Sequence, residues 1–229
     1  LLGTFIWLIG GRSNESLSTV EPPFSIRDNI PLILNRNTLL LALGMVGAFA
    51  VFIGFSSWLP AYYNEVKGLP LEQAGSIVAM MPLIAAFSNP LSGFIQSKLG
   101  RRKPMLIMAG LLLPIFALGS FLLTNQISVI ICVMGLGAMF SIFIVATLTI
   151  PMELPGVSAS RVGIVTAAVL TMGNLSGVLS PIFVGSLTDL MGSYVPALAI
   201  LALTPFTLVI AGALLPETGP RGRGIAHNS

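Results

Sequence analysis

Charged side chains are scarce in this sequence. Only 8% of its 229 residues are Asp, Glu, Lys or Arg, whereas 55% are hydrophobic. Soluble domains carry about 25% charged residues. A chain with so little charge cannot cover its surface with polar groups, so much of its solvent must be lipid. The composition therefore predicts an integral membrane protein.

Cysteine and histidine are almost absent. Cys132 is the only cysteine, which excludes an intrachain disulfide. His227 is the only histidine and lies two residues from the end, which excludes an imidazole-based metal site or proton relay inside a membrane. We expect no cofactor. The small net charge of +3 sits in short loops, so we interpret it as a topology signal and expect no nucleic-acid partner.

Six apolar runs are each long enough to cross about 30 Å of hydrocarbon. They cover residues 39–62, 74–96, 105–123, 127–150, 162–187 and 194–215. A backbone exposed to lipid must satisfy its hydrogen bonds internally, and a barrel strand needs only about ten residues. The runs therefore predict an all-α, polytopic membrane bundle of six transmembrane helices.

The cations are distributed asymmetrically between the loops. If the six helices alternate in direction, ten of the eleven Lys and Arg residues fall on one side, and only Lys67 falls on the other. The positive side is cytoplasmic. We therefore expect a multi-pass protein of the plasma or inner membrane, with its basic loops and C-terminus in the cytoplasm.

One segment occurs twice, 92 positions apart. Residues 88–104 and 180–196 share Ser, Gly, Gly and Pro at equivalent places, with Gly93 matching Gly185 and Gly100 matching Gly192. The first copy contains four cations, whereas Asp189 is the only charged residue of the second. One basic and one non-basic copy predict a 3+3 inverted repeat in the membrane.

The basic copy carries a recognisable loop pattern. Gly93 is followed after six residues by Gly100, Arg101 and Arg102, with Ser97 where the pattern has Asp. This segment, Glu153 followed by Arg161, and the closing residues 215–219 resemble the C-terminal half of a transporter of the major facilitator superfamily. The substitution at Ser97 puts in doubt the charge lock that the family builds there.

The resemblance implies a domain plan and a function. Residues 1–10 would end a truncated transmembrane helix, 11–36 form the cytoplasmic central loop, 37–216 the six-helix domain and 217–229 a cytoplasmic tail. The expected function is secondary active transport of a small solute by alternating access, with a second six-helix half as partner and with proton or ion coupling. Residues 58–63, 72–75 and 173–181 most resemble the branch that carries cyanate, nitroimidazole, nitrate and nitrite, so a small anion is one candidate substrate.

The resemblance also implies a set of residues that controls the change between access states. Gly93, Gly100, Arg101 and Arg102 would form a clamp that exists in one state only; topology signalling alone is the alternative. Glu153 and Arg161 are expected to pair with each other or with the other half, unless both are solvated loop charges. Asp189, the counterpart in the second copy of the family's Asp, completes this set, and its place near the outer surface suits a solvated charge.

No charged residue lies near the middle of any run, so the cationic partner of an anionic substrate would come from the other half. The candidate substrate-binding residues are therefore aromatic or small and polar: Ser57, Trp58, Tyr62, Asn89, Ser141 and Asn174. Each has a structural alternative. The aromatic residues suit an interfacial belt, the Ser141 hydroxyl suits a backbone carbonyl, and the two asparagines lie in stripes of small residues suited to helix packing.

Two other functions remain as alternatives. A non-transporting scaffold or receptor with the same fold would have the same sequence features. A membrane enzyme is disfavoured because hydrolysis at depth needs acid–base or metal-binding groups, which these runs lack.

Overall fold

The structure is a computed structural model that describes residues 26–154 and 157–219. The chain divides into two units, residues 1–30 and 31–229. Of the first unit only residues 26–30 are described, and they begin the short helix α2 (Ile26–Ile33). The expected helix end at residues 1–10 and most of the expected loop at 11–36 lie outside the described residues. Everything below concerns the second unit.

Six segments of the described chain are long and apolar enough to span a membrane, as expected. They are α3 (Arg36–Glu65), α4 (Leu71–Leu99), α5 (Lys103–Leu122), α6 (Gln126–Glu153), α7 (Val162–Met191) and the pair α8 (Tyr194–Leu203) and α9 (Phe206–Leu214). A single 3-10 turn, η1 (Ala159–Arg161), leads into α7. The described residues contain no strand, which confirms the all-α prediction.

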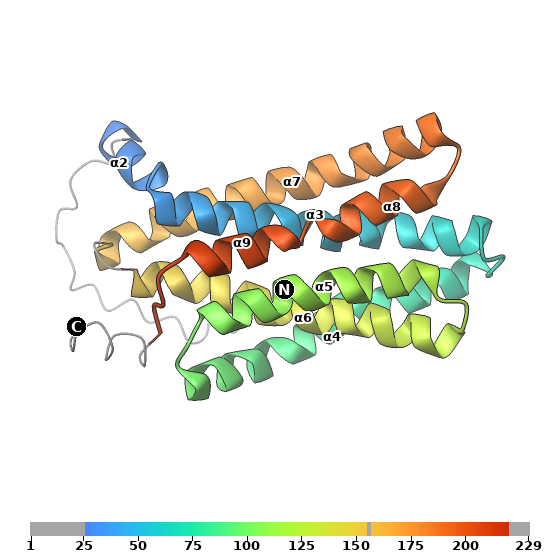
Figure 1. Cartoon of the computed structure of the whole chain (residues 1–229), viewed down its shortest axis with the longest axis horizontal. Helices are drawn as coiled ribbons and strands as arrows, with labels where there is room; N and C mark the ends of the chain where they lie inside the picture. Colours follow the sequence, from blue (N-terminus) through green and yellow to red (C-terminus); the bar gives the residue numbers. More distant parts are fainter. Residues whose placement is uncertain (1–25, 155–156, 220–229) are drawn as a thin grey trace, which may run out of the picture. The chain divides into compact units, whose positions relative to one another are not determined.

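The last span is a broken helix rather than the continuous run that we expected. Thr204 and Pro205 form a turn between α8 and α9, visible in Figure 1 as an interruption of the red ribbon. Pro205 has no backbone N–H, and its ring obstructs the preceding helical turn. The Thr204 hydroxyl donates to the carbonyl oxygen of Leu201, 2.8 Å away, and to that of Gly47 on α3, 2.9 Å away. The break therefore also fastens the last span to the first.

The turns at the ends of α4 and α7 confirm the repeat that the sequence predicted. Gly100 ends α4 and Gly192 ends α7, with φ angles of 63° and 65°. A Cβ atom disfavours this left-handed region, and glycine has none, so glycine is the residue best suited to it. The N–H of Gly100 donates to Gln96 and that of Gly192 to Thr188, two acceptors that are also one repeat length apart.

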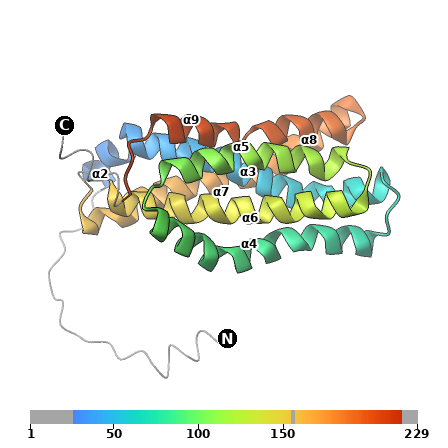
Figure 2. The same ribbon diagram turned by 60° about the horizontal axis from the view of Figure 1, so that its bottom comes forward.

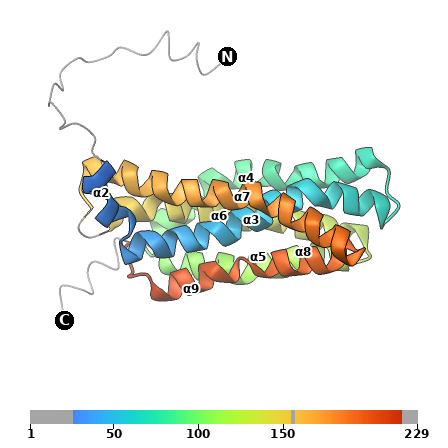
Figure 3. The same ribbon diagram turned by 90° about the horizontal axis from the view of Figure 1, so that it is seen from above.

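The packing of the helices follows the same repeat. In the repeat, α3 corresponds to α6, α4 to α7, and α5 to the pair α8 and α9. Accordingly, α3 packs along α7 as α6 packs along α4, and α8 and α9 pack on α3 as α5 packs on α6. Figure 2 shows α6 beside α4, and Figure 3 shows α3 beside α7. Glycines allow these close contacts: a Cβ on Gly137 would overlap the Met81 carbonyl, and one on Gly173 would overlap the Met45 side chain.

Side chains between the helices form the buried core, whereas two helices leave broad apolar faces uncovered. Met45, Phe55, Met81, Leu113 and Phe143 are fully enclosed. The uncovered faces belong to α4 and α7, which bury the smallest share of their apolar windows. α4 also bends along its course, as Figure 2 shows, and it contains two prolines.

Candidate functional site

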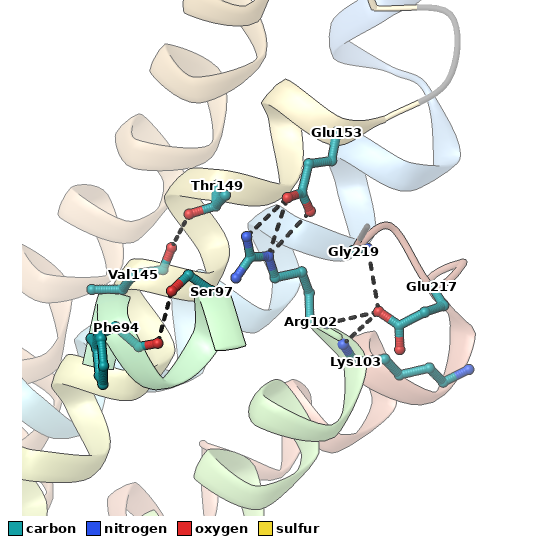
Figure 4. A network of polar contacts seen from close by, with 9 residues as sticks. All are labelled: Phe94, Ser97, Arg102, Lys103, Val145, Thr149, Glu153, Glu217 and Gly219. Atoms are coloured by element: carbon teal, nitrogen blue, oxygen red, sulfur yellow. Dashed lines mark hydrogen bonds and ion pairs between the residues drawn. The ribbon is translucent and has the colours of Figure 1, made fainter. Parts of the chain in front are cut away.

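One end of the bundle, here called the basic end, carries four cations where α4 meets α5: Lys98 in the last turn of α4, Arg101 and Arg102 in the loop, and Lys103 at the start of α5. Arg102 is buried, with 8% of its surface exposed. Its guanidinium holds the carboxylate of Glu153 at the end of α6 through Nη2 at 2.9 Å and through Nε at 3.2 and 3.3 Å (Figure 4). Paired donors of this kind favour one relative orientation of the two groups. The pair therefore ties the start of α5 to the end of α6.

A second carboxylate closes the same end from the C-terminal side. Oε1 of Glu217 accepts hydrogen bonds from the backbone N–H of Arg102 at 2.7 Å and of Lys103 at 3.4 Å (Figure 4). It thereby satisfies donors at the first turn of α5, where negative charge is favoured by the helix dipole. Gly219 lies so close that a Cβ there would overlap the Gly100 carbonyl. Residues 217–219 thus pack on the α4–α5 loop.

Only some of the expected gating residues lie close to one another in the structure. Arg102, Glu153 and Gly100 come together at the basic end, and Glu153 pairs with Arg102, a partner that we did not expect. Arg101 and Arg161 are exposed.

Three further positions take no part in the contacts of Arg102, Glu153 and Glu217. A Cβ on Gly93 would meet open space within this half, so the expected close helix approach is not found there. Ser97, at the position of the family's Asp, donates to Phe94 of its own helix at 2.8 Å (Figure 4). Asp189 is exposed at the other end of the bundle.

A chain of polar side chains joins α4 and α6 below the basic end. The Ser141 hydroxyl lies 2.8 Å from Oδ1 of Asn89 and 2.9 Å from the Ser92 hydroxyl. Ser141 is fully buried, whereas Asn89 is exposed, and its amide nitrogen makes no hydrogen bond with the described residues. Of these two candidate binding residues, only Asn89 therefore offers a donor to a ligand.

Gln96, which the sequence did not single out, continues this polar contact between the helices. It is fully buried, and its amide nitrogen donates to the Ile142 carbonyl at 2.8 Å. Its Oε1 has no partner among the described residues. The sequence did contain a signal for this contact, because Gln96 lies within the basic loop pattern and a buried amide requires hydrogen-bond partners.

Sequence reasoning also missed an aromatic cluster between α3 and α6. The rings of Phe52 and Phe140 stack with centroids 3.9 Å apart, and Phe140 contacts Phe49 at 5.3 Å and Phe143 at 5.6 Å. A signal existed: Phe49 and Phe52 on the first run match Phe140 and Phe143 on the fourth, 91 positions later. This spacing is one residue shorter than the 92-residue repeat, so the cluster joins neighbouring rather than identical positions of the two repeat copies.

The candidate substrate-binding residues of α3 form hydrogen bonds within the bundle. Nε1 of Trp58 donates to the Pro181 carbonyl of α7 at 2.9 Å, and the Tyr62 hydroxyl donates to the Phe121 carbonyl of α5 at 2.9 Å. Tyr62 is 3% exposed. Ser57 is exposed, but its hydroxyl donates to Ile53 of its own helix. These groups hold helices together or cap local carbonyls in this conformation.

Asn174 is the candidate substrate-binding residue on α7. It is exposed near the centre of the helix, and its amide nitrogen donates to the Leu170 carbonyl one turn earlier, at 2.9 Å. The amide keeps a second N–H and its oxygen, so the exposed side chain can offer a ligand either a donor or an acceptor.

Comparison with known proteins identifies the family. The family model described as Major Facilitator Superfamily matches residues 1–181. A nitrite extrusion protein of Bacillus subtilis is 27% identical over 217 residues, which cover 89% of this chain and 50% of that protein. A probable nitrate/nitrite transporter, NarK2, of Mycobacterium tuberculosis is 27% identical over 149 residues, covering 62% of this chain and 35% of that protein.

A third relative differs in its printed substrate. It is a D-galactonate transporter of Escherichia coli, 27% identical over 197 residues that cover 78% of this chain and 44% of that protein. The chain spans at most about half the length of the three relatives described. The matched family model, the repeat and the six spans agree, so the chain belongs to the Major Facilitator Superfamily and has the architecture of a six-helix half of its fold.

Proposed function

We propose that the chain is the C-terminal half of a secondary transporter that moves a small oxyanion across the membrane by alternating access. The observation that carries this proposal is the set of relatives, whose names specify nitrate, nitrite, galactonate, galactarate or glucarate. Inorganic and organic members of this set share one chemical group, a small planar centre whose negative charge is spread over two or three oxygens. We infer that this group is what the transporter recognises.

The substrate would contact this half at the aromatic cluster and at Asn89. The edge of an aromatic ring carries partial positive charge, so rings that present an edge to an anion attract it weakly. The amide nitrogen of Asn89 supplies a hydrogen-bond donor without the desolvation cost of a buried cation. No Asp, Glu, Lys, Arg or His lies near the middle of the described spans, so the neutralising cation would belong to the other six-helix half.

The basic end would act as the cytoplasmic clamp. Arg102, Glu153 and Glu217 join the starts and ends of three spans there. A contact that exists in only one access state shifts the equilibrium between states by its own free energy. The distribution of cations supports a cytoplasmic location for this end.

Flux of radiolabelled nitrate, nitrite or D-galactonate into proteoliposomes that contain the full-length protein tests the proposal. We expect saturable uptake of at least one of these anions. Repeating the assay with an imposed pH gradient and with nitrite inside tests proton coupling and anion exchange. Asn89→Ala and Phe140→Leu should raise KM, whereas Ser76→Ala, a matched change at an exposed hydroxyl of α4 bonded to its own helix, should not.

The result that would contradict transport is equally specific. A folded protein that binds an anion in equilibrium dialysis but shows no flux in either direction would favour the second candidate, a non-transporting receptor of the same fold. A protein that neither binds nor moves any of these anions would refute the oxyanion assignment.

A further inference from the structure

A groove of about 660 Å³ runs along the outside of α5 at the basic end. Arg101, Lys103 and Glu217 lie at its polar end. Its wall is made of apolar side chains from the first turns of the helix: Pro104, Ile107, Met108, Leu111 and Leu112. The groove is thus charged at one end and apolar along its length, which is the polarity of a lipid molecule.

The polar end carries a net positive charge. Arg101 is exposed and makes no ion pair or hydrogen bond with the described parts of the chain. Nζ of Lys103 is held at the rim by the carbonyl oxygens of Ala213 at 2.7 Å and Leu215 at 3.4 Å, which fix its position without neutralising it. Oε1 of Glu217 is turned toward the backbone N–H groups of α5, and Figure 4 shows the Lys103 side chain pointing away from it.

The apolar wall has the length of the upper part of an acyl chain. From Pro104 to Leu112 the helix rises about 12 Å, at about 1.5 Å per residue. The exposed stripe continues along the same helix at Ile115, which is 61% exposed. α5 is long and apolar enough to span a membrane, so its first turn would lie at headgroup depth and the following turns in the acyl region.

We propose that this groove binds an anionic glycerophospholipid, with its phosphate between Arg101 and Lys103 and an acyl chain along α5. Two cations against one carboxylate that is already used favour a negatively charged headgroup over a zwitterionic one, whose ammonium would lie beside Arg101. The five apolar side chains distinguish a lipid from free phosphate, which would use the cations alone. This lipid site is independent of the solute that the protein carries.

Lipid retention by the purified full-length protein in detergent, measured by native mass spectrometry, tests the site. The probes are phosphatidylglycerol, phosphatidylcholine, phosphatidylethanolamine and inorganic phosphate. We expect phosphatidylglycerol to be retained preferentially. Arg101→Gln with Lys103→Gln should weaken its apparent affinity about 25-fold, at about fivefold per cation near a membrane surface. Lys98→Gln is the matched control, because Lys98 lies in the last turn of α4, near the same end of the bundle, but over the Phe94 ring and outside the groove.

A steric variant keeps the proposal testable if the charge changes disturb the loop. The larger side chain of Met108→Trp would fill the apolar part of the groove while both cations stay in place, so this variant should also retain less phosphatidylglycerol. Equal retention of the anionic and zwitterionic lipids, preference for phosphatidylethanolamine, or displacement of the lipid by inorganic phosphate would each overturn the proposal. So would a Met108→Trp protein that retains phosphatidylglycerol as well as the unaltered one.

Discussion

Trp58 on α3 and Pro181 on α7 are joined by a hydrogen bond of 2.9 Å from the indole Nε1 to the carbonyl oxygen. The ring also lies against Gly185, where a Cβ would come within 3.0 Å of its Cζ2 atom. A side chain that the sequence marks as a candidate cavity wall therefore serves as a contact between two spans.

Replacing Trp58 separates these two roles. Trp58→Phe keeps an aromatic ring but removes the donor, so we expect the free energy of unfolding in detergent to fall by about 1 kcal/mol. KM for the transported anion should stay unchanged. A rise in KM at unaltered thermal stability would instead assign Trp58 to the substrate site. Gly185→Ala should also destabilise the protein through the ring, whereas Gly163→Ala, which meets open space, should not.

The pair formed by Arg102 and Glu153 should behave as a unit. Its side chains are only 10% and 14% exposed, so removing one partner leaves the other charge poorly solvated. A double-mutant cycle with Arg102→Gln and Glu153→Gln should give a coupling energy of about 1–3 kcal/mol in unfolding measurements. Arg161→Gln, at an exposed cation, should change stability by less than about 0.5 kcal/mol. Strictly additive effects would show that the pair contributes no interaction energy.

Glycines at equivalent turns should respond alike although they lie at opposite ends of the bundle. Gly100→Ala and Gly192→Ala each force a Cβ into the left-handed region, at a cost of about 1–2 kcal/mol. Gly93→Ala lies within helix α4 and faces open space, so it should be neutral or stabilising by up to about 1 kcal/mol. Thermal unfolding of the three variants checks this, and equal losses at Gly93 and Gly100 would contradict the role of backbone geometry.

The orientation of the bundle can be tested with reporter fusions. An alkaline phosphatase fused after Gly68 should be active because that loop would face away from the cytoplasm, and one fused after Lys103 should be inactive. The physical reason is the concentration of cations in the α4–α5 loop compared with the single Lys67 in the α3–α4 loop. The reverse pattern of activities would invert the topology.

Local patterns in the sequence predicted most of the fold. Hydropathy placed the six spans to within four residues of their observed bounds at each end, and the 92-residue repeat anticipated the shared geometry of Gly100 and Gly192. The break at Pro205 was missed because one proline barely lowers the hydropathy of a long apolar run. Length and composition determine whether a segment crosses the membrane, but not whether its helix is continuous.

The candidate site was predicted less completely, because its contacts depend on how distant helices pack. The basic loop pattern pointed to Arg102, and the separate resemblance of the loop after the fourth run pointed to Glu153, but neither indicated that the two residues pair. Nothing local indicates that Glu217 accepts a hydrogen bond from a backbone group 115 residues earlier. Trp58 and Tyr62 were selected because they are aromatic and can donate hydrogen bonds. Their acceptors, the carbonyl oxygens of Pro181 and Phe121, become apparent only in the packed bundle.

The Glu217 carboxylate has one more consequence. Since it caps α5 while the chain that carries it continues directly from α9, a rigid displacement of the last span would pull on the start of α5 through that oxygen and through the Lys103 ammonium, which is bonded to the carbonyl oxygens of Ala213 and Leu215. Such a displacement would reach Arg102, and through it Glu153 at the end of α6.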